Sequence, residues 1–260
     1  MRLDSALVER ALSDSRTKAR RRIESGDVVV NGAVVTKPSY DVEIGDVLEV
    51  RGDKDDVGRG ARKLRAALQE WGISAQGRVC LDIGASTGGF TQVLLESGAE
   101  RVVALDVGRD QLHPRVKEDP RVISLENINI REIDRDWWEQ HAGPKPSLVV
   151  VDVSFISLTQ VLPHVVGELG ATEWVALVKP QFEVGRGGVS DGIVKDPGLR
   201  EKALTRIVEC AGENGLMIAG IMRSPITGES GNVEYLCWLS PTHGRNQTQW
   251  TEQIHTLTHS

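Results

Sequence analysis

The chain has 260 residues, of which 40% are hydrophobic and 26% charged, and its formal net charge is −6. This length predicts two domains, one of which can be small, and the composition excludes a chain that is mostly disordered or collagen-like. The sequence has no run of 18 apolar residues, no signal-peptide core near its start and no paired spacing among its three cysteines. We therefore expect a cytoplasmic protein without disulfides or membrane helices.

The negative charge is unevenly distributed along the chain. Residues 1–51 contain nine basic and nine acidic side chains, whereas residues 71–260 contain 17 basic and 24 acidic ones. Within the first stretch, residues 16–22 carry five basic side chains and no acidic one. Such a cluster is usually a solvated helix face, but it also suits contacts with nucleic-acid phosphates. The net charge alone therefore does not exclude a nucleic-acid partner.

The first fifty residues predict two short helices followed by a small sheet. Residues 13–15 (Ser-Asp-Ser) offer N-caps for the second helix, and Gly26 can end it. Asn31-Gly32 is the preferred pair for a type I′ turn, so it predicts a hairpin between the valine-rich runs on either side. The expected elements are helices over residues 3–11 and 16–24 and strands over residues 28–30, 33–35 and 47–50.

This arrangement resembles the alpha-L RNA-binding domain, which is named after a ribosomal protein. The residues that carry the resemblance are Arg2-Leu3-Asp4, Ser15-Arg16, Ala19, the run from Gly26 to Gly32, Lys37-Pro38 and Gly45-Asp46. The resemblance implies a structured RNA partner, with the basic side of the second helix facing phosphates. With the basic residues that open the next domain, the RNA-binding candidates are Arg2, Arg16, Lys18, Arg20, Arg21, Arg22, Lys37, Arg59 and Arg62.

A polar linker over residues 52–58 separates this domain (1–51) from a larger one over residues 59–240. The larger domain alternates strands and helices, which predicts an α/β fold with a doubly wound, mostly parallel, seven-stranded Rossmann-like sheet that binds ligands at the carboxyl ends of its strands. The polar segment 241–260 is expected to be a peripheral or disordered tail. The expected strands cover residues 79–82, 101–106, 122–125, 148–152, 174–179, 216–222 and 233–239, and the principal helices residues 59–71, 89–96, 158–169 and 200–214.

A glycine loop follows the first of these strands. It lacks the second glycine of a nicotinamide-dinucleotide fingerprint and the Gly-Lys-Ser/Thr of a P-loop. Its spacing instead suits S-adenosylmethionine, because Gly84 and Gly88 permit close backbone approach and Asp106, at the end of the next strand, can accept both ribose hydroxyls. A purely structural glycine turn is the alternative. The cofactor-binding candidates here are Asp82, Gly84, Ala85, Ser86, Thr87, Gly88, Gly89 and Asp106.

Four charged residues stand at positions that should converge on one cleft. Asp152 and Lys179 end buried strands, Glu234 begins the last strand, and Lys63 lies on the helix before the first strand. Each taken alone is more often a solvated rim residue. Together they suit methyl transfer to a ribose 2′-hydroxyl, which must be aligned and relieved of its proton. We interpret Lys179 as the base or alkoxide stabiliser and Asp152 as the residue that positions it. The other two would orient the ribose.

Residues 59–240 resemble the FtsJ-type ribose 2′-O-methyltransferases, and residues 1–240 as a whole resemble the TlyA family of ribosomal RNA 2′-O-methyltransferases, historically labelled hemolysins. The resemblance implies that Lys63, Asp152, Lys179 and Glu234 are a catalytic tetrad. It also implies methylation of cytidine ribose in ribosomal RNA of the large subunit and, in some members, the small subunit. Asn129 fits a looser family pattern for contacting adenine or RNA. The matching runs are Arg59–Leu64, Asp82–Thr91, Asp106–Gly108, Val151–Leu158, Leu177–Glu183 and Gly228–Glu234.

Three other functions fit parts of the sequence. They are a non-enzymatic ribosome-binding module, a methyltransferase for transfer or messenger RNA, and the hemolysin of the historical label. A pore former needs a long apolar segment or a strongly amphipathic helix, and the sequence shows neither. The six histidines show no evident metal-ligand spacing, so we expect no metal.

Overall fold

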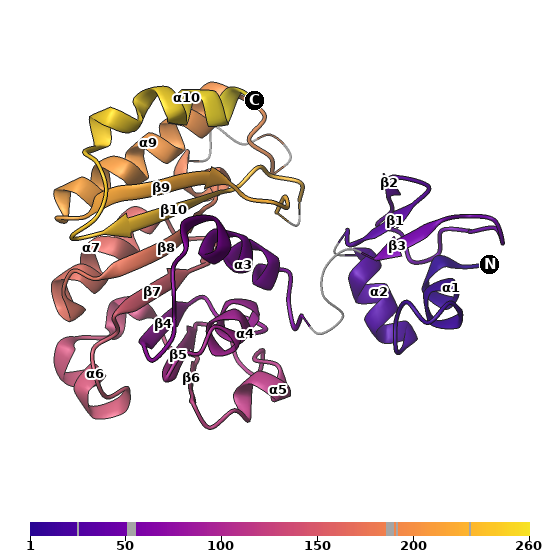
Figure 1. Ribbon diagram of the computed structural model, residues 1–260, viewed down its shortest axis with the longest axis horizontal. Helices are drawn as coiled ribbons and strands as arrows, with labels where there is room; N and C mark the ends of the chain where they lie inside the picture. Colours follow the sequence, from indigo (N-terminus) through magenta and orange to yellow (C-terminus); the bar gives the residue numbers. More distant parts are fainter. Residues whose placement is uncertain (25, 51–55, 186–189, 191, 229) are drawn as a thin grey trace. The chain divides into compact units, whose positions relative to one another are not determined.

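The computed structural model of this chain describes residues 1–24, 26–50, 56–185, 190, 192–228 and 230–260 (Figure 1). The chain forms two compact units, Met1–Arg59 and Gly60–Ser260. Residues 52–55 of the predicted linker lie outside the described residues, as does the side chain of the RNA-binding candidate Arg21.

The first unit combines two helices with a three-stranded antiparallel sheet in the order β2-β1-β3. Asn31 and Gly32 have positive φ angles of 50° and 85°, as the predicted type I′ turn requires. The elements are α1 (Leu3–Glu9), α2 (Arg16–Glu24), β1 (Val28–Val30), β2 (Ala33–Val34) and β3 (Leu48–Val50). The apolar core that holds the helices on the sheet includes Leu3, Leu7, Ile23, Val28 and Val30.

The second unit is built on a seven-stranded sheet in the order β6-β5-β4-β7-β8-β10-β9. Neighbouring strands from β6 to β8 pair in parallel, whereas β10 is antiparallel to both β8 and β9. The predicted α/β class and mostly parallel sheet are confirmed. The strands are β4 (Val79–Ile83), β5 (Arg101–Asp106), β6 (Val122–Glu126), β7 (Leu148–Val151), β8 (Glu173–Val178), β9 (Met217–Arg223) and β10 (Tyr235–Ser240).

Helices flank this sheet (Figure 1). β7 is apolar throughout and wholly buried, as expected for a strand covered on both faces. The sequence pattern missed α5, α6 and α8, because helices of four to seven residues are too short to show a helical period. The helices are α3 (Gly60–Trp71), α4 (Gly89–Glu96), α5 (Pro114–Lys117), α6 (Arg135–His141), α7 (Leu158–Leu169), α8 (Pro180–Glu183), α9 (Pro197–Glu213) and α10 (Thr251–His259), with 3-10 turns η1 (Ile130–Glu132) and η3 (Gln247–Trp250).

The segment after Ser240 is not the peripheral or disordered tail that its polar composition suggested. It forms η3 and α10, and Trp250 and Ile254 are buried in the main core of the unit. The indole N–H of Trp250 donates to the carbonyl of Ile218 at 3.1 Å. A helix on a protein surface needs apolar residues on one face only, so a few well-placed side chains anchor an otherwise polar segment.

Candidate active site

The ends of β7, β8 and β10 bring three of the four charged candidates to one edge of the sheet. Asp152 directly follows β7, and Lys179 directly follows β8. In the antiparallel pairing of β10 with β8, Tyr235 lies opposite Val178. Glu234, the residue just before β10, is therefore close to Lys179, the residue just after β8, at this edge.

Lys63 and Glu234 form a buried ion pair. Lys63 Nζ donates to Glu234 Oε2 at 2.6 Å, and the two side chains are only 8% and 2% exposed. Charged groups at this depth are rarely found without a partner, because burial removes their hydration. A Cβ atom at Gly228 would lie 2.6 Å from Glu234 Oε1, so glycine at that position leaves room for the carboxylate.

Lys179 and Asp152 form a second pair, which is less deeply buried. Lys179 Nζ lies 2.6 Å from Asp152 Oδ1 and donates to Ser154 Oγ at 2.9 Å. The contact with Asp152 is at ion-pair distance, although its angles are not those of a hydrogen bond. An ammonium group has three N–H donors, so the bond to Ser154 leaves donors that can be directed at other groups.

The two pairs are close to each other in the second unit. Gly60 begins α3, and a Cβ atom there would lie 3.7 Å from Asp152 Oδ2. Lys63 stands one turn further along the same helix. The structure thus brings the four predicted residues together, and it pairs Lys63 with Glu234 and Lys179 with Asp152.

The loop between β4 and α4 turns tightly beside this edge. Gly84, Ser86 and Gly88 have positive φ angles of 83°, 47° and 91°. A Cβ atom at Gly84 would collide with the backbone carbonyl of Asp152, and one at Gly88 would lie 2.8 Å from Leu112 Cδ1. Conformation and space therefore both require glycine at these two positions. Of the other loop candidates, Ser86 and Thr87 are exposed, whereas Ala85 and Gly89 are buried.

Asp82 lies beneath this loop and is fully buried. Its Oδ2 accepts a hydrogen bond from Thr91 Oγ1 at 2.6 Å, whereas its Oδ1 has no hydrogen-bond partner among the described residues. Burial raises the pKa of Asp82 to about 7; the nearby charge of Asp152 adds to this, and the bond from Thr91 opposes it. The expected contact of Asp82 with a ligand remains a prediction.

Asp106 is fixed by backbone donors at the end of β5. The N–H groups of Ser86 and Gly108 donate to its two carboxylate oxygens, each at 2.7 Å. Each oxygen keeps a further acceptor site, as contact with ribose hydroxyls requires. Asn129, after β6, caps η1 by accepting from the Arg131 N–H at 3.1 Å. The ligand contacts of Asp106 and Asn129 remain predictions.

Two polar residues that sequence reasoning left without a role support this edge. Ser154 accepts the hydrogen bond of Lys179 described above. Glu183, in the last turn of α8, accepts from the Leu158 N–H at 2.9 Å and pairs with Ser157 Oγ. Burial raises the pKa of Glu183. This carboxyl group therefore ties the segment after β8 to the start of α7, a contact that no spacing in the sequence indicates.

Phe155 is the third residue that sequence reasoning missed. Its side chain is 92% exposed, and its φ angle is 66°. Its ring centroid lies 5.2 Å from that of Phe182, whose ring faces Lys179 Nζ at 6.0 Å. A bulky residue in the left-handed region is strained, and such strain is concentrated at functional sites.

Two of the RNA-binding candidates also stabilise the first unit. Arg2 and Arg16 each form an ion pair of 3.1 Å with the buried Asp4. The hydrogen bond from Arg2, with that from Arg16, holds the pKa of Asp4 well below its usual range. Lys18 forms an exposed pair with Asp14 at 2.8 Å.

The described RNA-binding candidates all keep exposed surface. Five of them are exposed and three are partly buried, so each could reach a phosphate. Which of them contact RNA remains a prediction. The exposed ones are Arg2, Arg16, Lys18, Arg20 and Lys37, and the partly buried ones are Arg22, Arg59 and Arg62.

The fold and the site define a Rossmann-like methyltransferase with a small α+β domain before it. Residues 57–240 match the family described as FtsJ-like methyltransferase, and residues 1–48 match the S4 domain. The chain is 46% identical to the 16S/23S rRNA (cytidine-2′-O)-methyltransferase TlyA of Mycobacterium tuberculosis, over 92% of this chain and 89% of that protein. It belongs to the TlyA family of FtsJ-like methyltransferases, which confirms the resemblance noted in the sequence.

Two further comparisons carry the hemolysin name. The chain is 43% identical to Hemolysin A of Brachyspira hyodysenteriae, over 91% of this chain and 98% of that protein. A solved structure from Streptococcus thermophilus, also described as a hemolysin, covers 100% of this chain and 95% of its own, with a TM-score of 0.76 and 36% identity. In the described part of the chain, every helix is too short or too polar to cross a membrane.

Proposed function

We propose that this protein methylates the 2′-hydroxyl of a cytidine ribose in ribosomal RNA, with S-adenosylmethionine as the methyl donor. The observation that supports it most directly is the pairing of Lys179 with Asp152 and of Lys63 with Glu234 beside a glycine loop. The cytidine and ribosomal RNA specificity comes from the name of the Mycobacterium tuberculosis relative. Such a substrate implies a cytoplasmic location and ribosomal subunits as partners.

The residues around the glycine loop fit this cofactor. Gly84 lets the loop backbone approach the Asp152 backbone, and Asp106 offers acceptor sites for two ribose hydroxyls. The buried Oδ1 of Asp82 is an acceptor that has no hydrogen-bond partner in the described part of the chain, and a polar ligand or its water could satisfy it. Bound there, S-adenosylmethionine would supply a methyl group on a positively charged sulfur.

Lys179 is the residue that would act on the RNA hydroxyl. Asp152 and Ser154 contact its amine and so limit the positions that this amine can take. Lys179 would take the proton of the 2′-hydroxyl as a base or, as an ammonium, stabilise the developing alkoxide, so that the ribose oxygen could accept the methyl group that the cofactor would supply. The Lys63–Glu234 pair would orient the ribose. The 2.6 Å hydrogen bond between the two side chains fixes their positions, and fixed polar groups can hold a substrate in one orientation.

Two features would select RNA. The first unit exposes basic side chains on and around α2, among them Arg16, Lys18 and Arg20, which suit phosphates. Phe155 presents an exposed aromatic ring next to Phe182, whose own ring faces Lys179, and the base of the target nucleotide could stack on the Phe155 ring. We assign residues 1–51 to RNA binding, residues 52–58 to the linker and residues 59–240 to methyl transfer.

The test is transfer of a tritiated methyl group from S-adenosylmethionine to ribosomal subunits from cells that lack this gene. Wild-type protein should label ribosomal RNA, and mapping of ribose methylation should place the label on a cytidine 2′-oxygen. Lys179→Ala should abolish labelling while cofactor affinity stays nearly unchanged. Lys179→Arg should also be inactive, because a guanidinium does not accept a proton near neutral pH.

The same assay separates the alternatives. No incorporation into any RNA would favour a non-enzymatic ribosome-binding module. Label in transfer or messenger RNA alone would keep the chemistry and replace the substrate. Loss of cofactor binding together with activity in Lys179→Ala would contradict the assigned role of Lys179. Leakage of dye from liposomes on addition of purified protein would instead support the hemolysin name.

A further inference from the structure

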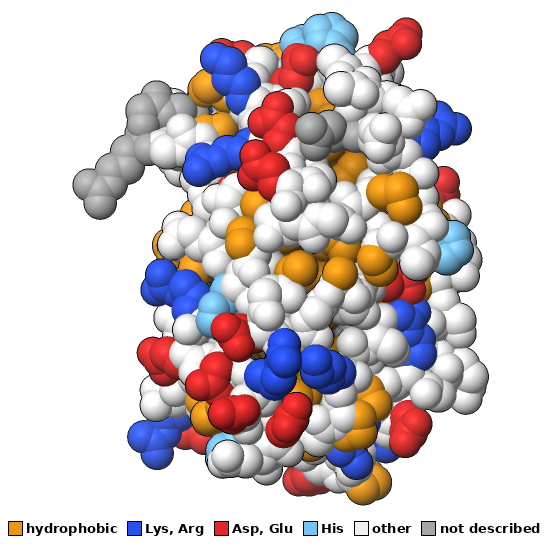
Figure 2. Space-filling view, turned by 90° about the vertical axis from the view of Figure 1, so that its left-hand side faces the viewer, with side chains coloured by type: hydrophobic (Ala, Val, Ile, Leu, Met, Phe, Trp, Pro, Cys, Tyr) orange, Lys and Arg blue, Asp and Glu red, His pale blue; other side chains and the backbone are white. Residues whose placement is uncertain are grey.

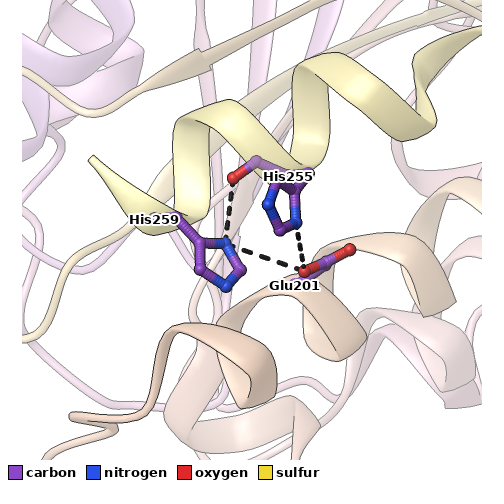
Figure 3. Close-up of side chains that lie close together, drawn as sticks. All are labelled: Glu201, His255 and His259. Carbon is purple, nitrogen blue, oxygen red and sulfur yellow. Dashed lines mark hydrogen bonds and ion pairs between the residues drawn. The ribbon is translucent and has the colours of Figure 1, made fainter.

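Three side chains with metal-ligating atoms gather where α10 packs on α9 (Figure 3). They are His255 and His259 of α10 and Glu201 of α9, and their ligand atoms all lie within 4.8 Å of one another. We propose that these residues bind a divalent transition-metal ion, with zinc as the expected metal. The site shares no residue with the candidate active site.

The distances suit such an ion. His255 Nδ1 lies 3.1 Å from Glu201 Oε2, and His259 Nδ1 lies 3.7 Å from the same oxygen. Zinc binds imidazole nitrogen and carboxylate oxygen at about 2.0–2.2 Å, so neighbouring ligands of a tetrahedral ion stand about 3.3 Å apart. The two measured distances lie on either side of this value. His259 Nδ1 also lies 3.0 Å from the His255 carbonyl oxygen, so its ring would turn away from that oxygen for all three side chains to reach one ion.

The helix places the two imidazoles side by side. Residues four apart lie on the same helix face, and the two rings are stacked with centroids 4.0 Å apart and planes 28° apart. Both rings are exposed, so they can turn toward a common point without disturbing the core. Figure 2 shows histidine side chains at the surface at the top of the molecule, where α10 lies.

The backbone that carries the ligands is held firmly. Ile254, next to His255, is buried in the main core, and Thr258, next to His259, is fully buried. The Thr258 carbonyl accepts from Arg200 Nη2 at 2.8 Å, which ties α10 to α9 next to Glu201. A rigid backbone reduces the entropy that metal binding must overcome.

The ligand set indicates the class of metal and a role for it. Two imidazole nitrogens and one carboxylate oxygen suit zinc and its neighbours in the transition series, whereas magnesium and calcium prefer oxygen ligands alone. An ion here would link α9 to α10 across 54 residues of sequence and so hold the C-terminal helix on the domain. The spacing His255-x-x-x-His259 was not recognised in the sequence, because the segment was expected to be a tail and not a helix.

The experiment is calorimetric titration of zinc chloride into the full chain, purified without a polyhistidine tag and freed of metal with a chelator that is then removed. One zinc should bind per chain. His255→Asn, His259→Asn and Glu201→Gln should each weaken binding by about tenfold or more. The matched control is His141→Asn, which removes an exposed histidine from the end of another helix, α6, and should leave zinc affinity unchanged.

A second measurement separates metal binding from an effect on folding. Zinc should raise the thermal unfolding midpoint of the wild type and slow amide hydrogen exchange in α10, and it should do neither in His255→Asn. Without zinc the variant and the wild type should unfold at the same temperature. The proposal is overturned if zinc does not saturate one site, if the three variants bind as the wild type does, or if His141→Asn weakens binding equally.

Discussion

The buried Lys63–Glu234 pair gives the sharpest prediction for the candidate active site. Lys63→Met would remove one charge and leave the Glu234 carboxylate, only 2% exposed, without its partner at 2.6 Å. Removal of one member of a buried pair costs about 3–5 kcal/mol, because the remaining charge keeps its desolvation penalty and loses the compensating attraction. For a unit of this size, that corresponds to a fall of about 10 °C in the unfolding midpoint.

A double-mutant cycle separates this structural cost from catalysis. Glu234→Gln should destabilise the protein to a similar degree as Lys63→Met, whereas the double variant should recover most of the loss, since neither charge is then buried alone. Methyl transfer should stay low in all three variants. The control Glu96→Gln weakens an exposed pair between α4 and α3, Glu96 with Arg65 at 2.9 Å, and should cost less than about 1 kcal/mol.

The assays are thermal denaturation and methyl transfer to ribosomal RNA on the same preparations. If the double variant regains methylation as well as stability, the pair is purely structural and its assigned role in orienting the ribose is wrong. If Lys63→Met costs no more than the Glu96→Gln control, the pair does not carry the energy that its burial implies.

Three further predictions concern the surroundings of the site. Gly84→Ala should abolish cofactor binding and lower stability by about 1–3 kcal/mol, because Gly84 has a φ of +83° and the new methyl group would collide with the Asp152 backbone. An unchanged affinity for S-adenosylmethionine in calorimetry would contradict this reasoning. The pKa of Asp82 is about 7 in the folded chain against an ordinary 3.8, so the folded chain binds this proton more tightly and the free energy of unfolding falls as pH rises from about 4 to 7. Asp82→Asn should reduce that fall by up to about 4 kcal/mol. Parallel curves of stability against pH for the variant and the wild type would contradict this prediction. Phe155→Ala should remove about 1–3 kcal/mol of base stacking and slow methylation of ribosomal RNA without changing cofactor affinity. Equal methylation rates for the variant and the wild type would show that the ring does not contact the RNA.

The sequence predicted the elements that have strong local signals. The Asn31-Gly32 turn fixes its hairpin, and apolar runs that end in a charge mark the strands before Asp152 and Lys179. A glycine with positive φ, such as Gly84, is also a local requirement of the chain. These features depend on residues close together in sequence, so they can be predicted without knowledge of the fold.

The tertiary structure alone showed that Lys63 pairs with Glu234. The pairing of Lys63 with Glu234 spans 171 residues and depends on β10 lying next to β8, an order that the succession of strands does not determine. The full burial of Asp82 and the anchoring of α10 through Ile254 likewise depend on what packs over them. The sequence by itself therefore determined which charged side chains and glycines are present for the chemistry. Long-range packing sets the burial of these side chains and the distances between them, so it decided how the charged groups are paired.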